Sequence, residues 1–357
     1  MAKATPIRIG IVGLGRAGWN MHCGELKGRE KKFQIVAACD PIKERRDLFT
    51  EKYGAKAYKT VEELINDPDV EMVDVANRQE DHVPDALKAL KAGKYVFLEK
   101  PIAVSYKEAL KLKAAKNKRK LFIRHNRRFE STFQHIREII DSGILGDVYE
   151  IKLRRNSFQR RDDWQTLKKC HGGQLLNWGP HLVDHGLQFL ESPLADLWSN
   201  LKCVAAAGDA EDHLKIIMVG KTGRMVDIEI SGGSALTEPV YIVLGSKGAL
   251  TSDDQSIHLK YLDPKKKLKP RKPNPDTPKM GTFGSADALK WIEKDIKVAP
   301  KAKCNTATIW DHLYSAVREK KAFPITLAQS LEVMRVISEV KKGTPFDNKP
   351  KRAAKKK

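Results

Sequence analysis

Long apolar runs are missing from this chain of 357 residues, and cysteine is scarce. A membrane-spanning helix needs about eighteen or more consecutive apolar residues, and no such run occurs, so we expect no membrane partner. The five cysteines are widely spaced without a C-x-x-C pair; they are Cys23, Cys39, Cys170, Cys203 and Cys304. This pattern argues against a disulfide framework or a zinc ribbon and is typical of reduced thiols. Because a secretory signal has no room before the apolar run that begins at Ile7, we expect a cytoplasmic protein.

The net charge of +21 could indicate nucleic-acid binding, but aromatic residues, on which bases would stack, make up only 7% of the chain. Six basic and no acidic residues lie between 349 and 357, and seven bases against two acids lie between 263 and 279. The first composition predicts a disordered tail, and the second, broken by prolines, an exposed loop. Neither stretch interleaves aromatic side chains on which bases could stack. We therefore expect no nucleic-acid partner.

A glycine-rich turn follows the first apolar run. Gly13-Leu14-Gly15-Arg16-Ala17-Gly18 comes directly after Ile7–Val12, and Asp40 ends a second apolar run, Phe33–Cys39. This order predicts a strand, a tight turn and a helix N-terminus that holds the pyrophosphate of a dinucleotide. The first glycine permits the turn, the second lets the backbone approach the phosphates, and the third lets the helix pack on the strand. The helix N-terminus offers unpaired N–H groups to the anion.

Asp40 bears on the choice of cofactor. A carboxylate at the end of the second strand accepts hydrogen bonds from the ribose hydroxyls and repels a 2′-phosphate, which favours NAD over NADP. Lys43, Arg45 and Arg46 follow at once and could instead serve a 2′-phosphate, although a solvated helix face is their simpler interpretation. The prediction is NAD, with NADP possible.

The remaining pattern predicts two unequal domains and a tail. Residues 1–124 alternate short apolar runs with helical segments, which predicts a doubly wound parallel sheet, a Rossmann domain. Residues 125–348 contain alternating strands and a hairpin around Gly245–Gly248, which predicts an open, mostly antiparallel sheet with helices on one face. Helical spacing recurs at 82–91, 310–320 and 328–341. The basic tail covers 349–357.

Glu99-Lys100-Pro101 follows the apolar run Tyr95–Leu98 and therefore lies at the carboxyl edge of the first sheet, where ligands bind in open α/β folds. Proline keeps Lys100 out of helical geometry, so its side chain can cross the crevice. A lysine beside a nicotinamide ring and a substrate alcohol can hydrogen-bond the oxygen on which negative charge develops. An ordinary surface lysine is the alternative.

A second dense segment runs from Gly172 to His185. Pro180 and the apolar spacing after it predict a helix starting near Gly179 or Pro180, with His181 in the first turn. A neutral imidazole there is a suitable general base for an alcohol proton. His181 and His185 are also four residues apart, but no third ligand stands at a telling spacing, and we predict no metal.

Flat aromatic side chains suit a pyranose ring, and we assign three of them to the substrate wall: Phe158, Trp164 and Trp178. Four arginines lie near them in the sequence: Arg154, Arg155, Arg160 and Arg161. An aromatic platform beside polar side chains is what a sugar site needs. The tryptophans could equally fill a core, and the arginines give only a weak indication of an anionic sugar.

Five motifs follow one another in a fixed order. They are the glycine turn, the run Asn77…His82…Ala92-Gly93-Lys94-Tyr95-Val96-Phe97-Leu98-Glu99-Lys100-Pro101, the segment Asn126-Arg127-Arg128-Phe129, the stretch Gly172-Gly173…Gly179-Pro180-His181…Asp184, and Gly245-Ser246-Lys247-Gly248. Together they resemble the Gfo/Idh/MocA oxidoreductases, the family of glucose–fructose oxidoreductase and inositol dehydrogenase, over residues 7 to 345. The resemblance implies a Rossmann domain and an open sheet through which subunits form homodimers or homotetramers. It also implies hydride transfer between NAD(P) and a sugar or polyol.

The resemblance further implies roles for single residues. Lys100 and His181 become the catalytic pair, and Asn126 and Arg127 fall where family members contact substrate. The resemblance adds Asn77, His82 and Glu99 to the glycine turn and Asp40, which the sequence pattern itself indicates. The full cofactor-binding set comprises Gly13, Leu14, Gly15, Arg16, Ala17, Gly18, Asp40, Asn77, Arg78, His82, Glu99, Lys100 and Pro101. The substrate-binding set comprises Asn126, Arg127, Phe158, Trp164, Asn177, Trp178 and His181.

Asn177 departs from the family pattern. Many dehydrogenases of the family carry aspartate four residues before the histidine, where it would orient the imidazole and stabilise its protonated form. Asparagine can orient the ring but cannot neutralise it. His181 would then be a weaker base, and Lys100 would carry more of the proton transfer, with Asn177 as the third member of the catalytic group.

The sequence therefore predicts an NAD-dependent oxidoreductase acting on a secondary alcohol or ketone of a sugar, polyol or glycoside. Two alternatives stay open: an NAD-dependent glycosidase or lyase in which oxidation is transient, and a non-catalytic sensor of a sugar or NAD. The presence of both Lys100 and His181 argues against the sensor.

Overall fold

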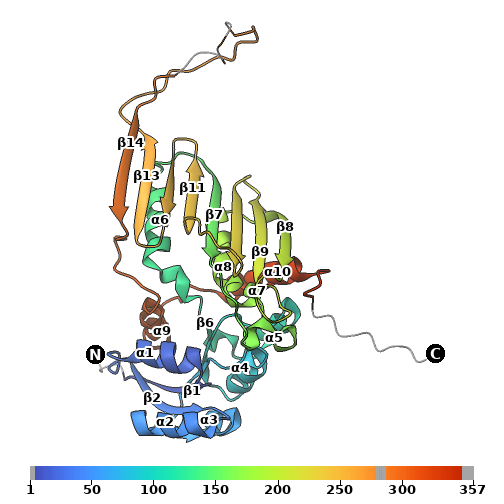
Figure 1. Ribbon diagram of the computed structural model, residues 1–357. Coiled ribbons are helices and arrows are strands. Elements are labelled where there is room, and N and C mark those ends of the chain that lie inside the picture. Colours follow the sequence, from blue (N-terminus) through green and yellow to red (C-terminus); the bar gives the residue numbers. More distant parts are fainter. Residues whose placement is uncertain (1–4, 279–280, 282, 284–286, 348–357) are drawn as a thin grey trace, which may run out of the picture.

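The computed structural model describes residues 5–278, 281, 283 and 287–347, so the predicted basic tail at 349–357 lies outside the described residues. The chain forms a six-stranded sheet and an eight-stranded sheet, drawn in Figure 1 one above the other. The first is parallel and the second is mostly antiparallel. The predicted fold class is confirmed.

The parallel sheet has the strand order β3-β2-β1-β4-β5-β6 of a doubly wound fold. Its strands are β1 (Ile7–Val12), β2 (Phe33–Cys39), β3 (Lys56–Tyr58), β4 (Met72–Val75), β5 (Tyr95–Leu98) and β6 (Leu121–Ile123). Helices cover both faces of such a sheet, and its strands are accordingly near-continuous apolar runs. The sequence predicts β1, β2 and β5 with the bounds that the structure has.

The crossover segments of this half are mainly helical. A π-helical turn, η1 (Arg16–His22), continues into α1 (Cys23–Leu26), and α2 (Lys43–Tyr53), α3 (Val61–Asn66), α4 (His82–Lys91) and α5 (Tyr106–Ala114) follow, with a short 3₁₀ turn η2 (Lys118–Lys120) before β6. α4 ends where predicted, because Gly93 adopts a left-handed φ of 77° just beyond it.

The second sheet has the order β14-β13-β12-β11-β7-β10-β9-β8. Its strands are β7 (Val148–Asn156), β8 (Leu194–Lys202), β9 (His213–Gly220), β10 (Met225–Ser231), β11 (Tyr241–Gly245), β12 (Gly248–Ser252), β13 (Ser256–Leu262) and β14 (Trp291–Lys297). Within it β7 and β10 pair in parallel, and the predicted hairpin is β11–β12. The inward residues of β9 alternate strictly with half-buried ones, as expected of a sheet with one covered face.

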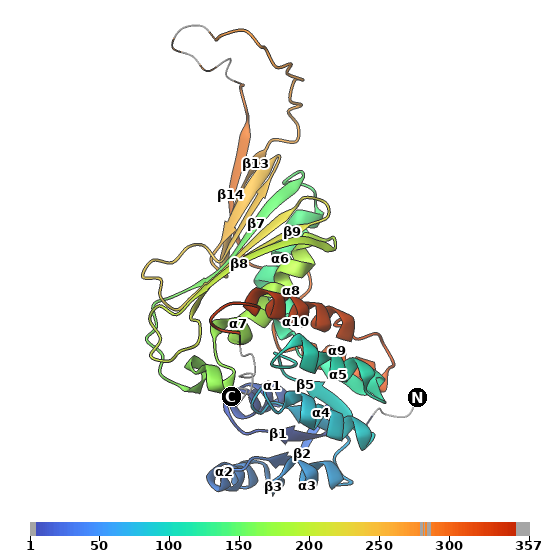
Figure 2. The same cartoon turned by 90° about the vertical axis from the view of Figure 1, so that its right-hand side faces the viewer.

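Helices gather on one face of this sheet, as Figure 2 shows. They are α6 (Ser131–Asp141), α8 (Gly179–Leu190) and α10 (Leu327–Lys341). Shorter elements lead to and from the first sheet: η3 (Asn126–Phe129), η4 (Trp164–Thr166), η5 (Lys168–Cys170) and α7 (Gln174–Asn177).

Helix α9 (Thr308–Arg318) returns the chain to the first sheet. Its Trp310 is fully buried, with ring centroids 4.8 Å from Phe97 and 5.4 Å from Phe33. The predicted second domain, 125–348, therefore supplies a core residue to the first sheet, and this packing holds the two halves together.

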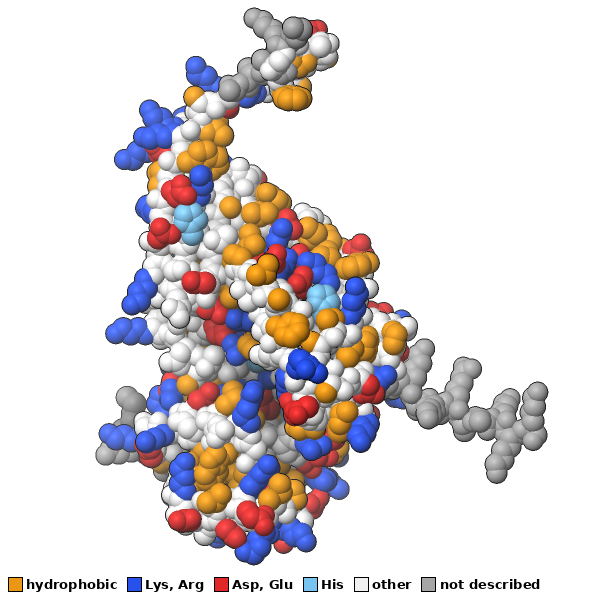
Figure 3. Space-filling view, viewed as in Figure 1, with side chains coloured by type: hydrophobic (Ala, Val, Ile, Leu, Met, Phe, Trp, Pro, Cys, Tyr) orange, Lys and Arg blue, Asp and Glu red, His pale blue; other side chains and the backbone are white. Residues whose placement is uncertain are grey.

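The connection between β13 and β14 extends away from the sheet as an arm (Figures 1 and 2). Residues 264–278 are exposed throughout, in agreement with the predicted loop, and Figure 3 shows Lys and Arg side chains along it. Across the described ranges, no helix combines the length and apolarity that crossing a bilayer requires.

Candidate active site

A cleft of about 980 Å³ lies between the two halves, at the carboxyl ends of β1, β2, β4 and β5. One wall consists of residues that directly follow these strands, and the other comes from the segments 161–165 and 176–181. Most of the predicted site residues line it: Gly13, Gly15, Arg16, Ala17, Asp40, Asn77, Arg78, His82, Glu99, Lys100, Pro101, Asn126, Arg127, Trp164, Asn177, Trp178 and His181. The edge of the sheet that the sequence indicates is therefore the edge at which these residues meet.

The glycine turn has the geometry that a phosphate cradle needs. Gly13 has a φ of 91°, and a Cβ atom there would lie 2.7 Å from Cα of Asn77. A Cβ atom on Gly18 would lie 1.9 Å from the carbonyl oxygen of Gly13, so only glycine lets η1 pack against the turn. No described side chain caps η1 at Gly15, which leaves its first N–H groups for an anion. These features fit a dinucleotide pyrophosphate.

Asp40 is buried at the end of β2, with only 2% of its surface exposed. Its carboxylate accepts hydrogen bonds from the N–H groups of Leu14 (2.8 Å) and Ile42 (2.9 Å). Arg45 donates to the same carboxylate from Nη1, at 3.2 Å, and also lines the cleft. The carboxylate that would repel a 2′-phosphate is thus partly neutralised by a guanidinium.

His82 and Asn77 form the floor of the cleft beside β4 and β5. His82 hydrogen-bonds through Nδ1 to the carbonyl oxygen of Pro101, at 2.7 Å, and burial lowers its pKa. A neutral ring that donates from Nδ1 accounts for both observations. Asn77 donates from Nδ2 to Asp85 at 2.8 Å, which fixes its amide at the end of β4.

Lys100 crosses the cleft. Its peptide bond to Pro101 is cis, and its Nζ donates to the main-chain carbonyl of Asn177, 3.1 Å away on the opposite wall. Burial lowers the pKa of Lys100 below its usual range; Glu99 opposes this shift, while three nearby guanidinium groups reinforce it. The side chain is therefore aimed as the sequence predicts, and its ammonium is a better proton donor than an exposed one.

A buried ionic network fixes Glu99 behind Lys100. Oε1 of Glu99 accepts from Arg124 (2.7 Å) and hydrogen-bonds His22 (3.1 Å), while Oε2 accepts from the N–H of Lys100 (2.7 Å). His22 also bonds Asp74 at 2.7 Å. Burial opposes ionisation of Glu99, but Arg124 and His22 hold its pKa well below the usual range. His22 keeps a raised pKa despite its burial, because Asp74 faces it.

His181 lies in the first turn of α8, with Pro180 at the helix start, as predicted. Burial and the nearby Lys100 hold the pKa of His181 well below its usual range, so the ring is neutral. Its buried Nδ1 has no hydrogen-bond partner among the described residues. Asn177 contacts Lys100 through its carbonyl oxygen and does not orient this nitrogen, which differs from the expectation.

Aromatic rings and arginines share the substrate wall. The guanidinium carbon of Arg127 lies 4.3 Å from the ring centroid of Trp178, and that of Arg155 lies 5.2 Å from it. Arg78 from the first half lies 4.9 Å from the ring of Trp164 in the second. Both tryptophans line the cleft and are only partly buried, although Trp178 also packs against the core.

Three predicted residues do not line the cleft. Phe158 is 59% exposed, forms an isolated β-bridge with Gly233 beyond the ends of β7 and β10, and is not part of the wall. Leu14 and Gly18 shape the turn instead of facing the cleft: the Leu14 side chain is buried beside Phe49. Of the four arginines, Arg154 pairs with Asp227, Arg155 pairs with Asp254 beside Trp178, and Arg160 is exposed, so only Arg161 lines the cleft.

Two of the residues that could have suggested a metal site, His185 and Asp184, have other partners. His185 hydrogen-bonds the carbonyl of Arg127 at 3.0 Å and stacks on Phe133, with centroids 4.1 Å apart. Asp184 forms an ion pair with Arg128 at 2.5 Å. Within the described ranges, no three His, Cys, Asp or Glu side chains are grouped as metal ligands.

His22, Asp74 and Arg124 are neighbours of the site that no motif indicates. Of the three, only Asp74 is recognisable in the sequence as unusual, because a carboxylate inside the buried strand β4 requires a partner. That partner, His22, is 52 residues away in the chain, and nothing local points to it. Arg124 directly follows β6 and is fully buried, so strand order alone brings it beside Glu99.

Comparison with known proteins agrees with this geometry. Residues 7–126 match the family model of an oxidoreductase family with an NAD-binding Rossmann fold. Residues 133–251 match the model of the GFO/IDH/MocA C-terminal domain. The chain belongs to the Gfo/Idh/MocA oxidoreductase family. It is thus an NAD(P)-binding oxidoreductase, and the predicted family is confirmed.

Individual relatives are distant. The scyllo-inositol 2-dehydrogenase (NADP(+)) IolW of Bacillus subtilis is 25% identical over 94% of this chain and 93% of its own. The inositol 2-dehydrogenase of Salmonella typhimurium is 37% identical over 45% of this chain and 49% of its own. Among solved structures, an NAD-binding protein from Listeria innocua has a TM-score of 0.77 at 21% identity, covering 93% of this chain and 92% of that one. An oxidoreductase from Thermotoga maritima has a TM-score of 0.76 at 22% identity, covering 94% and 96%.

Proposed function

We propose that this Gfo/Idh/MocA protein is an NAD-dependent oxidoreductase that acts on a secondary alcohol or the corresponding ketone of a sugar, polyol or glycoside. Lys100 and His181 handle the proton. The observation that carries the proposal is the hydrogen bond of Lys100 to the Asn177 carbonyl, which holds the amine across the cleft beside His181. A lowered lysine pKa next to a neutral imidazole is what an alcohol oxidation requires.

The residues around the glycine turn fit the cofactor. Gly13, Gly15 and Arg16 would receive the pyrophosphate, and His82 and Asn77 would border the nicotinamide end of the cleft. When bound, NAD(P) supplies the hydride chemistry that amino-acid side chains lack. The side chains of this protein would orient the substrate, exclude water and transfer the proton.

NAD is the cofactor that we propose, with NADP accepted more weakly. The Asp40 carboxylate at the cleft supports NAD, because it is an acceptor for ribose hydroxyls and repels a 2′-phosphate. Arg45 opposes this preference, since it both pairs with Asp40 and offers a cation to a phosphate. The name of the relative IolW specifies NADP(+).

The proton path involves two side chains. A substrate hydroxyl between Lys100 and His181 would give up its proton to the neutral imidazole of His181, as the carbon that bears the hydroxyl loses hydride to the cofactor that the cleft would hold. Lys100 hydrogen-bonds the same oxygen and stabilises the charge that develops on it. In the reverse direction the protonated imidazole of His181 returns the proton to the same oxygen, while Lys100 again stabilises the charge on it.

A cyclic polyol or pyranose suits the second wall. Trp178 and Trp164 offer flat faces, and Asn126, Arg127 and Asn177 offer polar groups to hydroxyls. Two of the relatives named above are inositol dehydrogenases, which supports a polyhydroxylated ring as substrate.

We also propose that the open face of the second sheet forms a homodimer or homotetramer interface. Trp198 on β8 is 56% exposed there, next to Ile217 of β9 in register. An exposed aromatic residue beside an aliphatic one on an uncovered sheet face is typical of an oligomer contact. A cytoplasmic location, which we infer as well, is supported by five cysteines that are all free.

The test is net reduction of NAD or NADP by a panel of inositols, pyranosides, polyols and uronates, followed through the nicotinamide absorbance. We expect reduced cofactor to accumulate with one substrate class. Tight NADH binding without any reduction across the panel would contradict the proposal. If a glycoside were cleaved without net NADH, the transient-oxidation glycosidase would replace it.

A further inference from the structure

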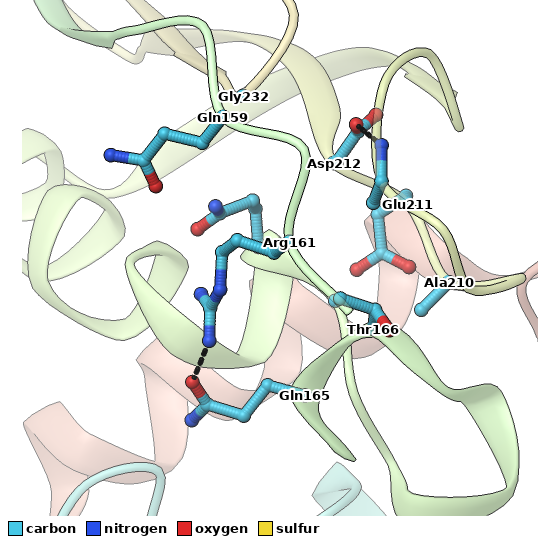
Figure 4. A pocket seen from close by; sticks show the side chains of 11 residues that line it. Gln159, Arg161, Gln165, Thr166, Ala210, Glu211, Asp212 and Gly232 are labelled. Atoms are coloured by element: carbon cyan, nitrogen blue, oxygen red, sulfur yellow. Dashed lines mark hydrogen bonds between the residues drawn. The ribbon is translucent and has the colours of Figure 1, made fainter. Parts of the chain in front are cut away.

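A small pocket borders the start of α7. It is lined by Gln159, Arg161, Gln165, Thr166, Gly173, Gln174, Ala206, Ala210, Glu211, Asp212 and Gly232. Figure 4 shows Glu211 entering it from the loop before β9, with Arg161 bonded to Gln165 nearby. Arg161 and Gln165 also line the large cleft, so the pocket and the reaction centre share a wall.

Glu211 holds the start of α7. Its carbonyl oxygen accepts the N–H of Gln174 at 2.9 Å, and its side-chain Oε1 accepts the N–H of Leu175 at 3.2 Å. Only 1% of Glu211 is exposed, so water cannot take over these bonds. The first two N–H groups of the helix thus depend on one residue from a distant loop.

Gly173 accommodates this carboxylate. The glycine has a φ of 111°, and a Cβ atom on it would lie 2.1 Å from Oε1 of Glu211. A Cβ atom on Gly172 would lie 2.3 Å from the carbonyl oxygen of Gln165. The paired glycines therefore leave space for Glu211 on one side and for the cleft-lining loop on the other.

Helix α7 carries the groups that act on Lys100 and His181. The N–H of Asn177 donates to the Gly173 carbonyl at 3.1 Å, and the Asn177 carbonyl receives Nζ of Lys100. The N–H of His181 then donates to the carbonyl of Trp178 at 3.0 Å. The N–H of Trp178 donates to the carbonyl of Gln174 at 2.9 Å, so main-chain bonds connect Gln174, which Glu211 holds, through Trp178 to the backbone of His181.

We propose that Glu211 is a positioning residue for the reaction centre. By anchoring the first turn of α7, it fixes the Asn177 carbonyl opposite Lys100 and the helix start that bears His181. The role rests on the proposed function of Lys100 and His181. Glu211 does not line the large cleft and so acts only through α7.

The raised pKa of Glu211 makes glutamine, a neutral residue of similar shape, the conservative substitution. Burial raises its pKa, and its Oε2 has no hydrogen-bond partner among the described residues. Oε1 of Gln174, in the same pocket, is also buried without a partner. Glu211→Gln keeps the acceptor for Leu175 and adds a donor, whereas Glu211→Ala removes the acceptor and enlarges the pocket.

The experiment compares three variants of the full chain. Glu211→Ala should lower kcat about 100-fold, because small misplacements of reacting groups have effects of this size, while NADH affinity stays within about threefold. Glu211→Gln should keep most of the wild-type kcat, because it keeps the acceptor for the N–H of Leu175. The matched control is Asp227→Ala, a buried carboxylate on β10 that pairs with Arg154 and Lys215. It should destabilise the fold and leave kcat within about twofold.

A second readout does not depend on activity. Reductive methylation with carbon-13 label gives a lysine NMR signal that Lys100→Met identifies, and its titration reports the pKa of Lys100. Glu211→Ala should move this pKa towards the ordinary lysine value, because a released α7 admits water. Loss of stability with unchanged kcat and unchanged Lys100 titration would overturn the proposal. A shifted titration in a protein without dehydrogenase turnover would refute the proposed function and leave the positioning role intact.

Discussion

Lys100 and the main-chain carbonyl of Asn177 are joined by a 3.1 Å hydrogen bond across the cleft, although 77 residues separate them in the chain. The acceptor is a neutral carbonyl, and in the part of the chain that the structure describes no carboxylate forms an ion pair with the amine. The hydrogen bond therefore orients the ammonium group, and no ion pair within the described residues holds it. This arrangement suits an amine that must share a proton with a substrate oxygen.

The glycine turn predicts a sharp contrast between two alanine substitutions. Gly18→Ala places a Cβ atom 1.9 Å from the Gly13 carbonyl oxygen and should destabilise the fold by about 3 kcal/mol and weaken NADH binding at least about tenfold. Gly24→Ala in α1 meets nothing within 4 Å and should be neutral or stabilise by about 0.5–1 kcal/mol. Urea unfolding and NADH fluorescence measure both effects. Equal behaviour of the two variants would contradict the packing described for η1.

Cofactor choice should respond in opposite directions to two neighbouring substitutions. Asp40→Asn keeps an acceptor for Leu14 but removes the charge, so the NADP-to-NAD ratio of kcat/KM should rise about tenfold or more. Arg45→Ala should lower that ratio, because the cation available to a 2′-phosphate is lost.

Lys43→Ala is the control for the cofactor experiment, since Lys43 pairs with Asp47 and does not line the cleft. Lys43→Ala removes one positive charge, as Arg45→Ala does, and should leave the NADP-to-NAD ratio of kcat/KM unchanged. If Lys43→Ala lowered the ratio as much as Arg45→Ala, net charge and not the ribose pocket would determine the preference.

Asn177→Asp should restore a stronger base. A carboxylate at this position adds negative charge near His181 and Lys100, whose pKa values are both held low, and so raises both. The acidic limb of the pH profile of kcat/KM should move up by about one pH unit. The pH profile of the purified variant checks this, and an unchanged limb would show that His181 does not carry the proton.

Acid sensitivity of the fold should come partly from His185. Burial lowers its pKa to about 3, against about 6.5 in an unfolded chain, so the unfolded state binds the proton first. Stability present above about pH 6.5 is therefore lost as the pH falls towards 3. His185→Gln stays neutral, can still donate to the Arg127 carbonyl, and should reduce the slope by up to about 1.4 kcal/mol per pH unit.

Urea unfolding between about pH 5 and pH 7 measures that slope. His258→Gln is the control, because His258 is exposed and its pKa is raised by Asp295. An unchanged slope in His185→Gln would mean that the other buried histidines, or carboxylates, account for the acid sensitivity.

The parts of the site that the sequence predicts correctly are those that local patterns determine. The bounds of β1 and β2, the turn after Val12, and the helix start at Pro180 each follow from a few adjacent residues. Lys100 is predictable because the end of an apolar run marks the sheet edge. Local chemistry suffices wherever backbone conformation alone positions the group.

The rest depends on packing between distant segments. The sequence does not reveal which segments pack against each other. It therefore does not show that His22 and Arg124 bond Glu99, or that Glu211 bonds the start of α7. The prediction for Phe158 is wrong because closeness to Trp164 in the sequence does not determine position: Phe158 forms a β-bridge with Gly233 after β7, is exposed, and does not line the cleft. The missing bond between Asn177 and His181 likewise follows from how α7 meets α8.

Transfer of a deuteride to the cofactor tests the central claim most directly. The substrate class found in the panel would carry deuterium on the oxidised carbon, and single-turnover mass spectrometry of the nicotinamide would follow the label. The protein should transfer deuterium to NAD, and Lys100→Met should slow the step by about 100- to 10,000-fold. The control Lys113→Met replaces an exposed lysine that does not line the cleft and should not slow the transfer. Unlabelled NADH, or equal rates in wild type and Lys100→Met, would contradict the account.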